Sequence, residues 1–297
     1  MSRRSKLVSL SEAAGLVGDG DRLALGGFTI YNRPLAFARE LVRQGRRGLT
    51  VVAMTAGPET ELLAAGGCLS RLETSYVGLE KFGLAQRVRA LSQSGELEIV
   101  DYSEVTSFDR FRADGDNQTF VPVDYLAGNS IVTPESGITP FTCPITGRPL
   151  FAVPAARPDV TVLHVPAADE FGNGLIPADR VMPQDLDIVM AQGSARLILT
   201  TERIVRTEDL ADVAMTVQIP AFRTSAVVFA PWGAHPGPMS GNYETDEPAF
   251  AEFAEAGRDQ ATSAAHLERT VYGPRDHDDY LNEFGVTRLV GLLRRRL

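Results

Sequence analysis

The stretch that decides the fold reads Asp19-Gly20-Asp21-Arg22-Leu23-Ala24-Leu25-Gly26-Gly27-Phe28-Thr29-Ile30-Tyr31-Asn32-Arg33-Pro34. Its apolar residues 23–25 predict a buried strand, and the double glycine with the aromatic residue after it predicts a turn. Pro34 suits the first position of a helix, because its ring presets φ and it lacks an N–H. The stretch therefore predicts a strand–loop–helix unit that presents bare backbone at the carboxyl end of a strand, where open α/β sheets bind ligands.

The residues that follow alternate between predicted helices and strands. Apolar residues recur at helical spacing after Pro34, residues 49–54 are typical of a second buried strand, and residues 59–65 predict another helix. This β-α-β-α order favours a parallel sheet with right-handed crossovers. Further strands are expected at 73–77, 97–100, 120–123, 160–165, 187–191, 197–200 and 226–230, and further helices at 11–17 and 84–92.

Two regions depart from this alternation. Residues 128–158 are rich in Gly, Pro, Thr and Ser, and they predict a long irregular segment of a kind that is uncommon unless it is functional or packs on a partner. We expect a single domain over 1–297, with the α/β fold of a doubly wound, mostly parallel sheet and a helical extension over 245–297. The helices expected in that extension are 247–255, 260–270 and 278–293.

Composition and charge limit the classes of function. The 297 residues are 44% hydrophobic and 23% charged, which is ordinary for a globular protein. A net charge of -9 argues against nucleic acid or a membrane surface as the main partner, because binding to phosphates needs a basic face. We expect no signal peptide and no transmembrane helix. The two cysteines, Cys68 and Cys143, predict buried thiols in a reducing cytoplasm rather than a disulfide framework.

The loop after the first predicted strand has the residues of a ligand-binding turn. Gly26 and Gly27 permit positive φ and close approach to the backbone. Asn32 is among the non-glycine residues best able to adopt a left-handed conformation. The helix after Pro34 would direct free N–H groups and a positive dipole end toward this position. The spacing is not the G-x-G-x-x-G of dinucleotide sites. The alternative, in which the glycines only turn a tight corner, stays open.

The same residues resemble the signature of the α chains of family I coenzyme A transferases. That signature has Asp-Gly, two free positions, three apolar residues, Gly-Gly-Phe, three free positions, Gly, one free position and Pro, and this chain departs from it only at Asn32, where glycine is usual. Residues 168–173 and 229–236 resemble later segments of these chains. Asn32 and the predicted C-terminal helices make the chain more similar to glutaconate-type α chains than to the short 3-oxoacid type. That longer subgroup includes hydrolases that open a ring in a steroid-derived acyl-CoA.

The resemblance implies an α subunit of a CoA-transferase. Its substrate would be a coenzyme A thioester, with no permanently bound cofactor. In this family the covalent nucleophile is a glutamate of the β chain, so the expected partner is a β subunit, in a heterotetramer or larger assembly. The alternatives are a hydrolase that opens a ring in a cyclic dicarbonyl acyl-CoA, and a non-catalytic binding subunit. The residues expected to bind substrate or CoA are Gly26, Gly27, Phe28, Asn32, Gly172 and Asn173.

Two carboxylates of this chain are candidates for chemistry. The stretch Glu135-Ser136-Gly137-Ile138 is similar to the β-chain nucleophile motif, but it lies in the segment rich in Pro and Thr, so we expect a loop carboxylate. Glu104 follows the predicted strand 97–100 and would lie on the ligand side of a parallel sheet. The ring-opening hydrolases bring an α-chain glutamate to the site at the matching position. Glu104 is therefore the expected catalytic residue, acting on substrate or water, with an exposed carboxylate near a helix N-cap as the alternative.

Several other residues have structural and functional interpretations. The four histidines show no paired metal spacing, so no metal is expected. His235 is expected to be a hydrogen-bonded turn residue, with a substrate contact as the alternative. For Gly172-Asn173-Gly174, a type I′ turn and the floor of the active site both stay open. Trp232 is expected to pack in the protein rather than to stack on an adenine.

Overall fold

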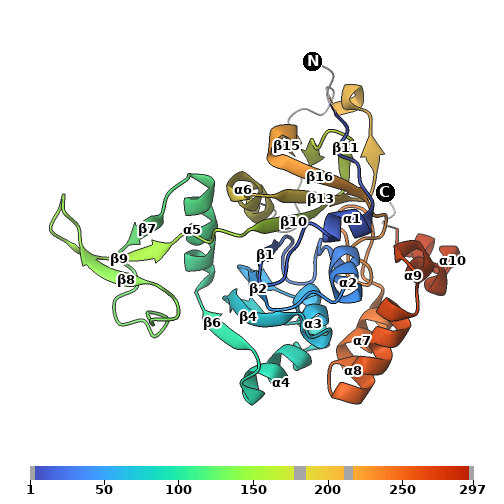
Figure 1. The fold of residues 1–297 in the computed structure, drawn as a ribbon, viewed down its shortest axis with the longest axis horizontal. Helices are drawn as coiled ribbons and strands as arrows, with labels where there is room; N and C mark the ends of the chain where they lie inside the picture. The colour runs from blue at the N-terminus through green and yellow to red at the C-terminus, as the bar shows by residue number, and fades with distance from the viewer. Residues whose placement is uncertain (1–3, 177–184, 211–216, 294–297) are drawn as a thin grey trace.

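A seven-stranded parallel sheet forms the centre of the molecule in the computed structural model, which describes residues 4–176, 185–210 and 217–293 (Figure 1). From β1 the chain adds β2, β4 and β6 on one side, and it adds β10, β13 and β16 on the other. The order reverses between β1 and β10, which confirms the doubly wound α/β fold. The strands lie in the order β16 (Thr224–Phe229), β13 (Leu197–Thr201), β10 (Val160–Val165), β1 (Arg22–Leu25), β2 (Leu49–Val52), β4 (Leu69–Thr74) and β6 (Glu98–Asp101).

Helices cover both faces of this sheet because successive strand residues point to opposite sides. Leu23 and Leu25 of β1 belong to one buried cluster with residues of α2 (Leu35–Arg43) and α3 (Pro58–Ala65). Ala24, between them, belongs to a second cluster with residues of α5 (Glu104–Gly115) and α6 (Asp185–Gly193). The short helix α1 (Leu10–Ala14) and helix α4 (Gln86–Ser94) lie at two predicted helical positions.

Three sequence predictions are wrong. Residues 187–191 form part of α6 rather than a strand, and the buried residues 186, 187, 190 and 191 recur at helical spacing. Helix α5 was not expected at all. Residues 128–158 are not wholly irregular, because two strands within them join a third in an antiparallel sheet that projects from the body (Figure 1). These strands are β7 (Phe120–Val123), β8 (Thr139–Thr142) and β9 (Pro149–Pro154).

Two smaller sheets accompany the large one. The four-stranded sheet has the order β14 (Ile204–Val205), β11 (Ala167–Asp169), β12 (Gly174–Leu175) and β15 (Val217–Ile219). The two-stranded sheet pairs β3 (Thr55–Ala56) with β5 (Tyr76–Val77), so the strand expected over 73–77 is divided between β4 and β5.

The C-terminal region consists of helices that pack beside α2 and α3 (Figure 1). Phe253 and Val271 belong to the same buried cluster as α2. The helix expected over 278–293 is broken at Gly285, where φ is +76°. The division into one domain and an extension stays a prediction. None of the described helices is both long and apolar enough to cross a membrane. The helices are α7 (Glu247–Ala256), α8 (Gln260–Leu267), a π-helical turn (Glu268–Tyr272), α9 (His277–Phe284) and α10 (Val286–Gly291).

Candidate active site

The residues 26–28 leave β1 where the strand order reverses. In open α/β sheets this switch point, at the carboxyl ends of the strands, is where ligands bind. The Phe28 N–H donates to the Tyr31 carbonyl oxygen at 3.0 Å, and the Tyr31 N–H donates back at 2.8 Å, which closes a tight turn. Both aromatic side chains are half-buried. We call residues 26–31 the glycine loop.

The double glycine is required by the groups packed behind it. Gly27 has a φ of +91°, and a Cβ added there would lie 2.4 Å from the Tyr31 carbonyl oxygen. A Cβ added at Gly26 would lie 2.4 Å from the Leu163 side chain and 2.8 Å from the Asp187 carboxylate. Contacts below 3.0 Å force atoms to move. The tight-corner interpretation therefore accounts for both glycines before any ligand is considered.

Asp187 of α6 is a buried neighbour of the glycine loop that the sequence did not reveal. Its Oδ1 accepts the Gly27 N–H at 2.8 Å. Burial raises the pKa of Asp187 to about 6, against the opposing effects of the Gly27 N–H and the Arg33 charge. The Gly27 amide is thus engaged by the protein itself. No local pattern signals this contact, because it joins residues 160 positions apart.

Arg33 is a second buried support, with 0% of its surface exposed. Its Nε lies 3.3 Å from the Glu59 carboxylate, a fully buried ion pair. Burial lowers the pKa of Arg33, and the charge of Glu59 opposes that effect. The guanidinium donates to backbone carbonyls at the end of β1, in the glycine loop and in β3. These acceptors belong to Leu25, Gly26, Thr29 and Thr55.

Asn32 joins the glycine loop to a distant turn. Its φ of +57° is the left-handed conformation predicted from the sequence. Its Oδ1 accepts the Ser240 N–H at 2.7 Å, and its own N–H donates to the Pro238 carbonyl at 3.0 Å. Only 1% of the residue is exposed, and its Nδ2 has no hydrogen-bond partner among the described residues. The contacts that the structure gives Asn32 are therefore internal.

A buried carboxylate organises the carboxyl end of β13. Oε1 of Glu202 lies 2.6 Å from His164 Nε2 and accepts the Tyr243 hydroxyl at 2.7 Å. Its Oε2 accepts the Trp232 N–H at 2.7 Å. The Trp232 ring centroid is 4.3 Å from that of Tyr243, so Trp232 packs on another aromatic residue as expected. Sequence reasoning missed Glu202, although its position directly after a buried strand was a usable signal.

His235 is fully buried and hydrogen-bonded on both ring nitrogens. Nδ1 lies 2.8 Å from the Tyr280 hydroxyl, and Nε2 lies 3.2 Å from the Asp246 carboxylate. Burial lowers the pKa of His235, while the Asp246 hydrogen bond opposes that effect. The expected hydrogen-bonded turn histidine is confirmed.

Glu104 occupies the same sheet edge as the glycine loop, but in a different setting. It is the first residue of α5, next to the N-cap Ser103, whose side chain accepts the Thr106 N–H. The Glu104 side chain is exposed, and no hydrogen bond or ion pair within the described parts of the chain engages it. Strands β2 and β4 separate β6 from β1, which is about 14 Å across the sheet. The structure therefore brings Glu104 to the expected edge without bringing it into contact with the loop.

Gly172 and Asn173 lie away from these residues. The Thr224 hydroxyl donates to the Gly172 carbonyl at 2.7 Å, and Thr224 begins β16 at the amino end of the sheet. The Asn173 side chain donates to Asp169 at 2.7 Å and accepts the Ala221 N–H at 3.0 Å. The structure thus does not place this turn beside the glycine loop.

The remaining candidates are also located. Glu135 lies exposed in a turn, where its carbonyl accepts a hydrogen bond from Arg71. Cys68 and Cys143 are free thiols, but only Cys68 is buried, which corrects the expectation of two buried thiols. Among the described residues, no group of three or more His, Cys, Asp or Glu side chains could hold a metal ion.

Comparison with known proteins places this arrangement among characterised ones. Residues 7–229 match the family model for Coenzyme A transferase. One of the two kinds of chain of a 3-oxoadipate CoA-transferase from Pseudomonas knackmussii is 32% identical over 93% of this chain and 97% of that protein. The crystal structure of glutaconate coenzyme A-transferase from Acidaminococcus fermentans superposes with a TM-score of 0.92 at 28% identity, covering 98% of this chain and 96% of that one.

Two further relatives widen the comparison. An uncharacterized protein of Archaeoglobus fulgidus is 32% identical over 98% of this chain, which spans 64% of that protein's length. A cholesterol ring-cleaving hydrolase subunit of Mycobacterium tuberculosis is 26% identical over 95% of this chain. The family model covers most of the sequence, and the fold agrees with that of a solved CoA-transferase. The chain therefore belongs to the coenzyme A transferase family, as a chain of the α type.

Proposed function

We propose that this chain is the α subunit of an enzyme that moves CoA between an acyl-CoA and a carboxylic acid, with the attacking glutamate on a separate β subunit. The observation that carries the proposal is the glycine loop at the switch point of the sheet. Buried groups hold this loop from behind, and its aromatic residues Phe28 and Tyr31 stay half-exposed in front. The transferase relatives are named as single subunits of their enzymes, which supports a partner chain.

The proposed reaction proceeds through two covalent intermediates. A glutamate oxygen of the partner attacks the thioester carbonyl, the C–S bond breaks, and CoA leaves as a thiolate from a mixed anhydride. The thiolate then attacks the glutamyl carbonyl, which releases the first carboxylate and leaves a glutamyl–CoA thioester. An acceptor carboxylate repeats these steps in reverse order, so that a new acyl-CoA forms and the glutamate is regenerated.

The contribution of this chain to that reaction is shape. Because the Gly27 N–H already donates to Asp187, it is not available to stabilise an oxyanion. We assign Gly26, Gly27, Phe28 and Asn32 to a rigid wall of the interface site. The proposal includes no permanently bound cofactor or metal, a coenzyme A thioester as substrate, a heterotetramer or larger assembly, and a cytoplasmic location. Gly172 and Asn173 enter it only through a longer substrate or a further contact with the partner.

Hydrolysis is the second candidate, and Glu104 favours it. An exposed carboxylate at the carboxyl edge of the sheet can act as a general base on water. The ring-cleaving hydrolase relative is 26% identical over nearly the whole chain. In a transferase the same Glu104 would act on the substrate, and in a hydrolase it would activate the water that opens the ring.

Dependence on an acceptor separates the candidates. The chain is co-purified with a β-type partner, given an acyl-CoA with and without a carboxylic acid, and the CoA esters are separated by chromatography. Transfer predicts a new acyl-CoA only when the acid is present. Turnover without any acid, with a ring-opened CoA ester as product, would replace transfer by hydrolysis. Activity that survives both Glu104→Ala and Gly27→Ala would indicate a non-catalytic binding subunit.

A further inference from the structure

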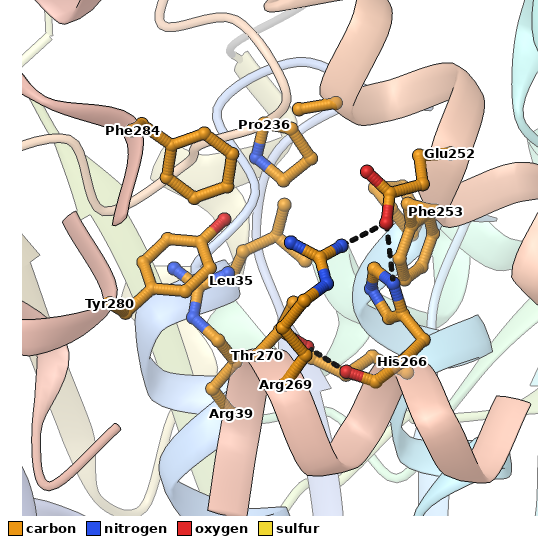
Figure 2. Close-up of a pocket in the computed structure, with 13 residues that line it drawn as sticks. Leu35, Arg39, Pro236, Glu252, Phe253, His266, Arg269, Thr270, Tyr280 and Phe284 are labelled. Carbon is orange, nitrogen blue, oxygen red and sulfur yellow. Dashed lines mark hydrogen bonds and ion pairs between the residues drawn. The ribbon is translucent and has the colours of Figure 1, made fainter. Parts of the chain in front are cut away.

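A narrow crevice separates α2 from the C-terminal helices, outside the candidate active site. Figure 2 shows side chains from α2, α7, α9 and the π-helical turn converging on it. Its volume is about 20 Å³, which is room for one or two particles the size of water. Both charged and aromatic side chains line it, including Arg39, Arg269, His266 and Tyr280.

Arg39 is a buried cation without a carboxylate partner in the described parts of the chain. Only 4% of the residue is exposed. Its Nη1 donates to the His235 carbonyl at 3.0 Å, and its guanidinium carbon lies 3.7 Å from the centre of the Tyr280 ring. Its Nη2 is buried and makes no hydrogen bond to any described residue. A buried guanidinium is ordinarily paired with an anion, because burial of an unpaired charge is costly.

A second unpartnered nitrogen lines the same crevice. Nδ1 of His266 is buried and lacks a hydrogen bond within the described residues. Burial, together with the charges of Arg269 and Arg39, lowers the pKa of His266 to about 4, so its ring is neutral at pH 7. A neutral imidazole can carry its proton on Nδ1 and donate it. The crevice therefore offers a cation and a second hydrogen-bond donor.

The acidic groups at the rim are already engaged. Arg269 forms ion pairs with both Glu252 and Glu283. Glu252 lies 4.0 Å from His266 Nδ1, beyond hydrogen-bond distance. These carboxylates are one-third to one-half exposed, whereas Arg39 is buried behind them. They satisfy Arg269 and leave Nη2 of Arg39 without an acceptor.

We propose that this crevice binds one small monovalent anion of the size of chloride against Nη2 of Arg39. The donors present are a guanidinium and an imidazole, which favour an anion over a cation. The volume excludes phosphate, sulfate and any larger carboxylate. A bound water is the alternative occupant, and it would satisfy the hydrogen bond without offsetting the charge.

The position of this site gives it a structural consequence. Arg39 holds the His235 carbonyl, and the turn that follows His235 binds Asn32 through Pro238 and Ser240. An anion at Arg39 therefore steadies the turn that anchors the glycine loop. The inference does not depend on which reaction the enzyme performs.

Bromide is the direct probe of the site. Crystals of the full chain are grown with sodium bromide in place of chloride, and the anomalous scattering of bromine is mapped. The proposal predicts a peak within about 3.5 Å of Arg39 Nη2. Density at that position without an anomalous signal would identify water and overturn the proposal.

Thermal unfolding of the full chain gives an independent readout. At constant ionic strength, replacing gluconate by chloride from 10 to 200 mM is expected to raise the midpoint by about 2–4 °C. Arg39→Gln should abolish the chloride dependence. Arg43→Gln, on the same helix and paired with Glu40, is the matched control and should keep it. An unchanged response in Arg39→Gln would contradict the proposal, and if that variant does not fold, the bromide map alone decides.

Discussion

The two parts of the candidate site at the carboxyl edge of the sheet are built in opposite ways. At β1, the glycine loop is held from behind by Asp187 and Arg33, both of which are buried. At β6, Glu104 is exposed at the start of α5 and has no internal partner in the described chain. The contrast indicates that the fold itself determines the shape at β1, whereas the chemistry at β6 is left to a substrate or a partner. Changes at β1 should therefore affect stability and activity together, and changes at Glu104 should affect activity alone.

Gly27→Ala should have the largest effect. The substitution combines an unfavourable φ with a 2.4 Å clash against backbone, so we expect a loss of about 3–5 kcal/mol in the free energy of unfolding and at least a 100-fold loss of turnover. Gly20→Ala is the matched control, because Gly20 also has positive φ but nothing within 4 Å of an added Cβ. It should lose only about 1 kcal/mol. Equal losses in the two variants, measured by denaturant unfolding, would show that crowding behind the loop is unimportant.

Glu73→Gln tests the link between the two parts of the site. The Glu73 carboxylate lies 2.9 Å from Arg22 of β1 and 2.6 Å from Arg110 of α5. The Gln variant keeps the size of the side chain but leaves Arg110 buried without its counter-ion, so we expect a loss of about 3 kcal/mol in the free energy of unfolding at pH 7.

The pH dependence of that loss provides its check. Burial alone would raise the pKa of Glu73, but the Arg22 hydrogen bond and the charge of Arg110 lower it to about 2. The folded pKa is below the unfolded value, so the stabilisation is present above about pH 4.5 and is lost as pH falls toward 2. The difference between wild type and Glu73→Gln should therefore shrink over that interval. A difference that stays constant down to pH 2 would rule out this explanation.

Asp187→Asn should act in the opposite direction. The folded pKa of Asp187, about 6, is above the unfolded value near 4, so ionisation of this group destabilises the native state as pH rises from 4 to 6. Asn keeps an acceptor for the Gly27 N–H and does not ionise. We expect the variant to gain up to about 3 kcal/mol over wild type above pH 6 and nothing at pH 4. Urea unfolding at several pH values measures this difference, and a loss of stability at pH 7 would contradict the account.

Glu104→Gln should change stability least. The side chain is exposed, so we expect less than about 1 kcal/mol, mostly from the lost charge at the start of α5. Turnover of the complex should fall at least tenfold if Glu104 acts on substrate or water. Glu135→Gln, which changes another exposed carboxylate, is the control and should leave turnover unchanged. Equal turnover in both variants and the wild type would remove Glu104 from the site.

Local patterns predicted the regular parts of this fold and failed where partners are distant. The apolar runs of β1, β2, β10 and β13 were recognisable because buried parallel strands are short and continuous. The same cue misled at residues 187–191, since an apolar run alone does not distinguish a strand from a buried helix. Strands β8 and β9 were missed because prolines at 140, 149 and 154 suggested a loop, although proline is tolerated at strand starts and edges.

The candidate site was predictable in its position but not in its supports. The glycines at 26 and 27 marked the switch point, because positive φ and close packing leave a local signature. Asp187 and Arg33 left none, since their partners are set by tertiary packing. The separation of Asn173 from the glycine loop was equally invisible, because a turn can be recognised locally while the end of the sheet it faces cannot.

The central claim is that the nucleophile belongs to another chain, and mapping the covalent intermediate tests it most directly. The complex of this chain with its β-type partner is incubated with an acyl-CoA and treated with borohydride, which reduces a glutamyl thioester to an alcohol. Both chains are then digested and analysed by mass spectrometry. The account predicts one modified glutamate in the partner and none in this chain. Modification of Glu104 or Glu135 would contradict it.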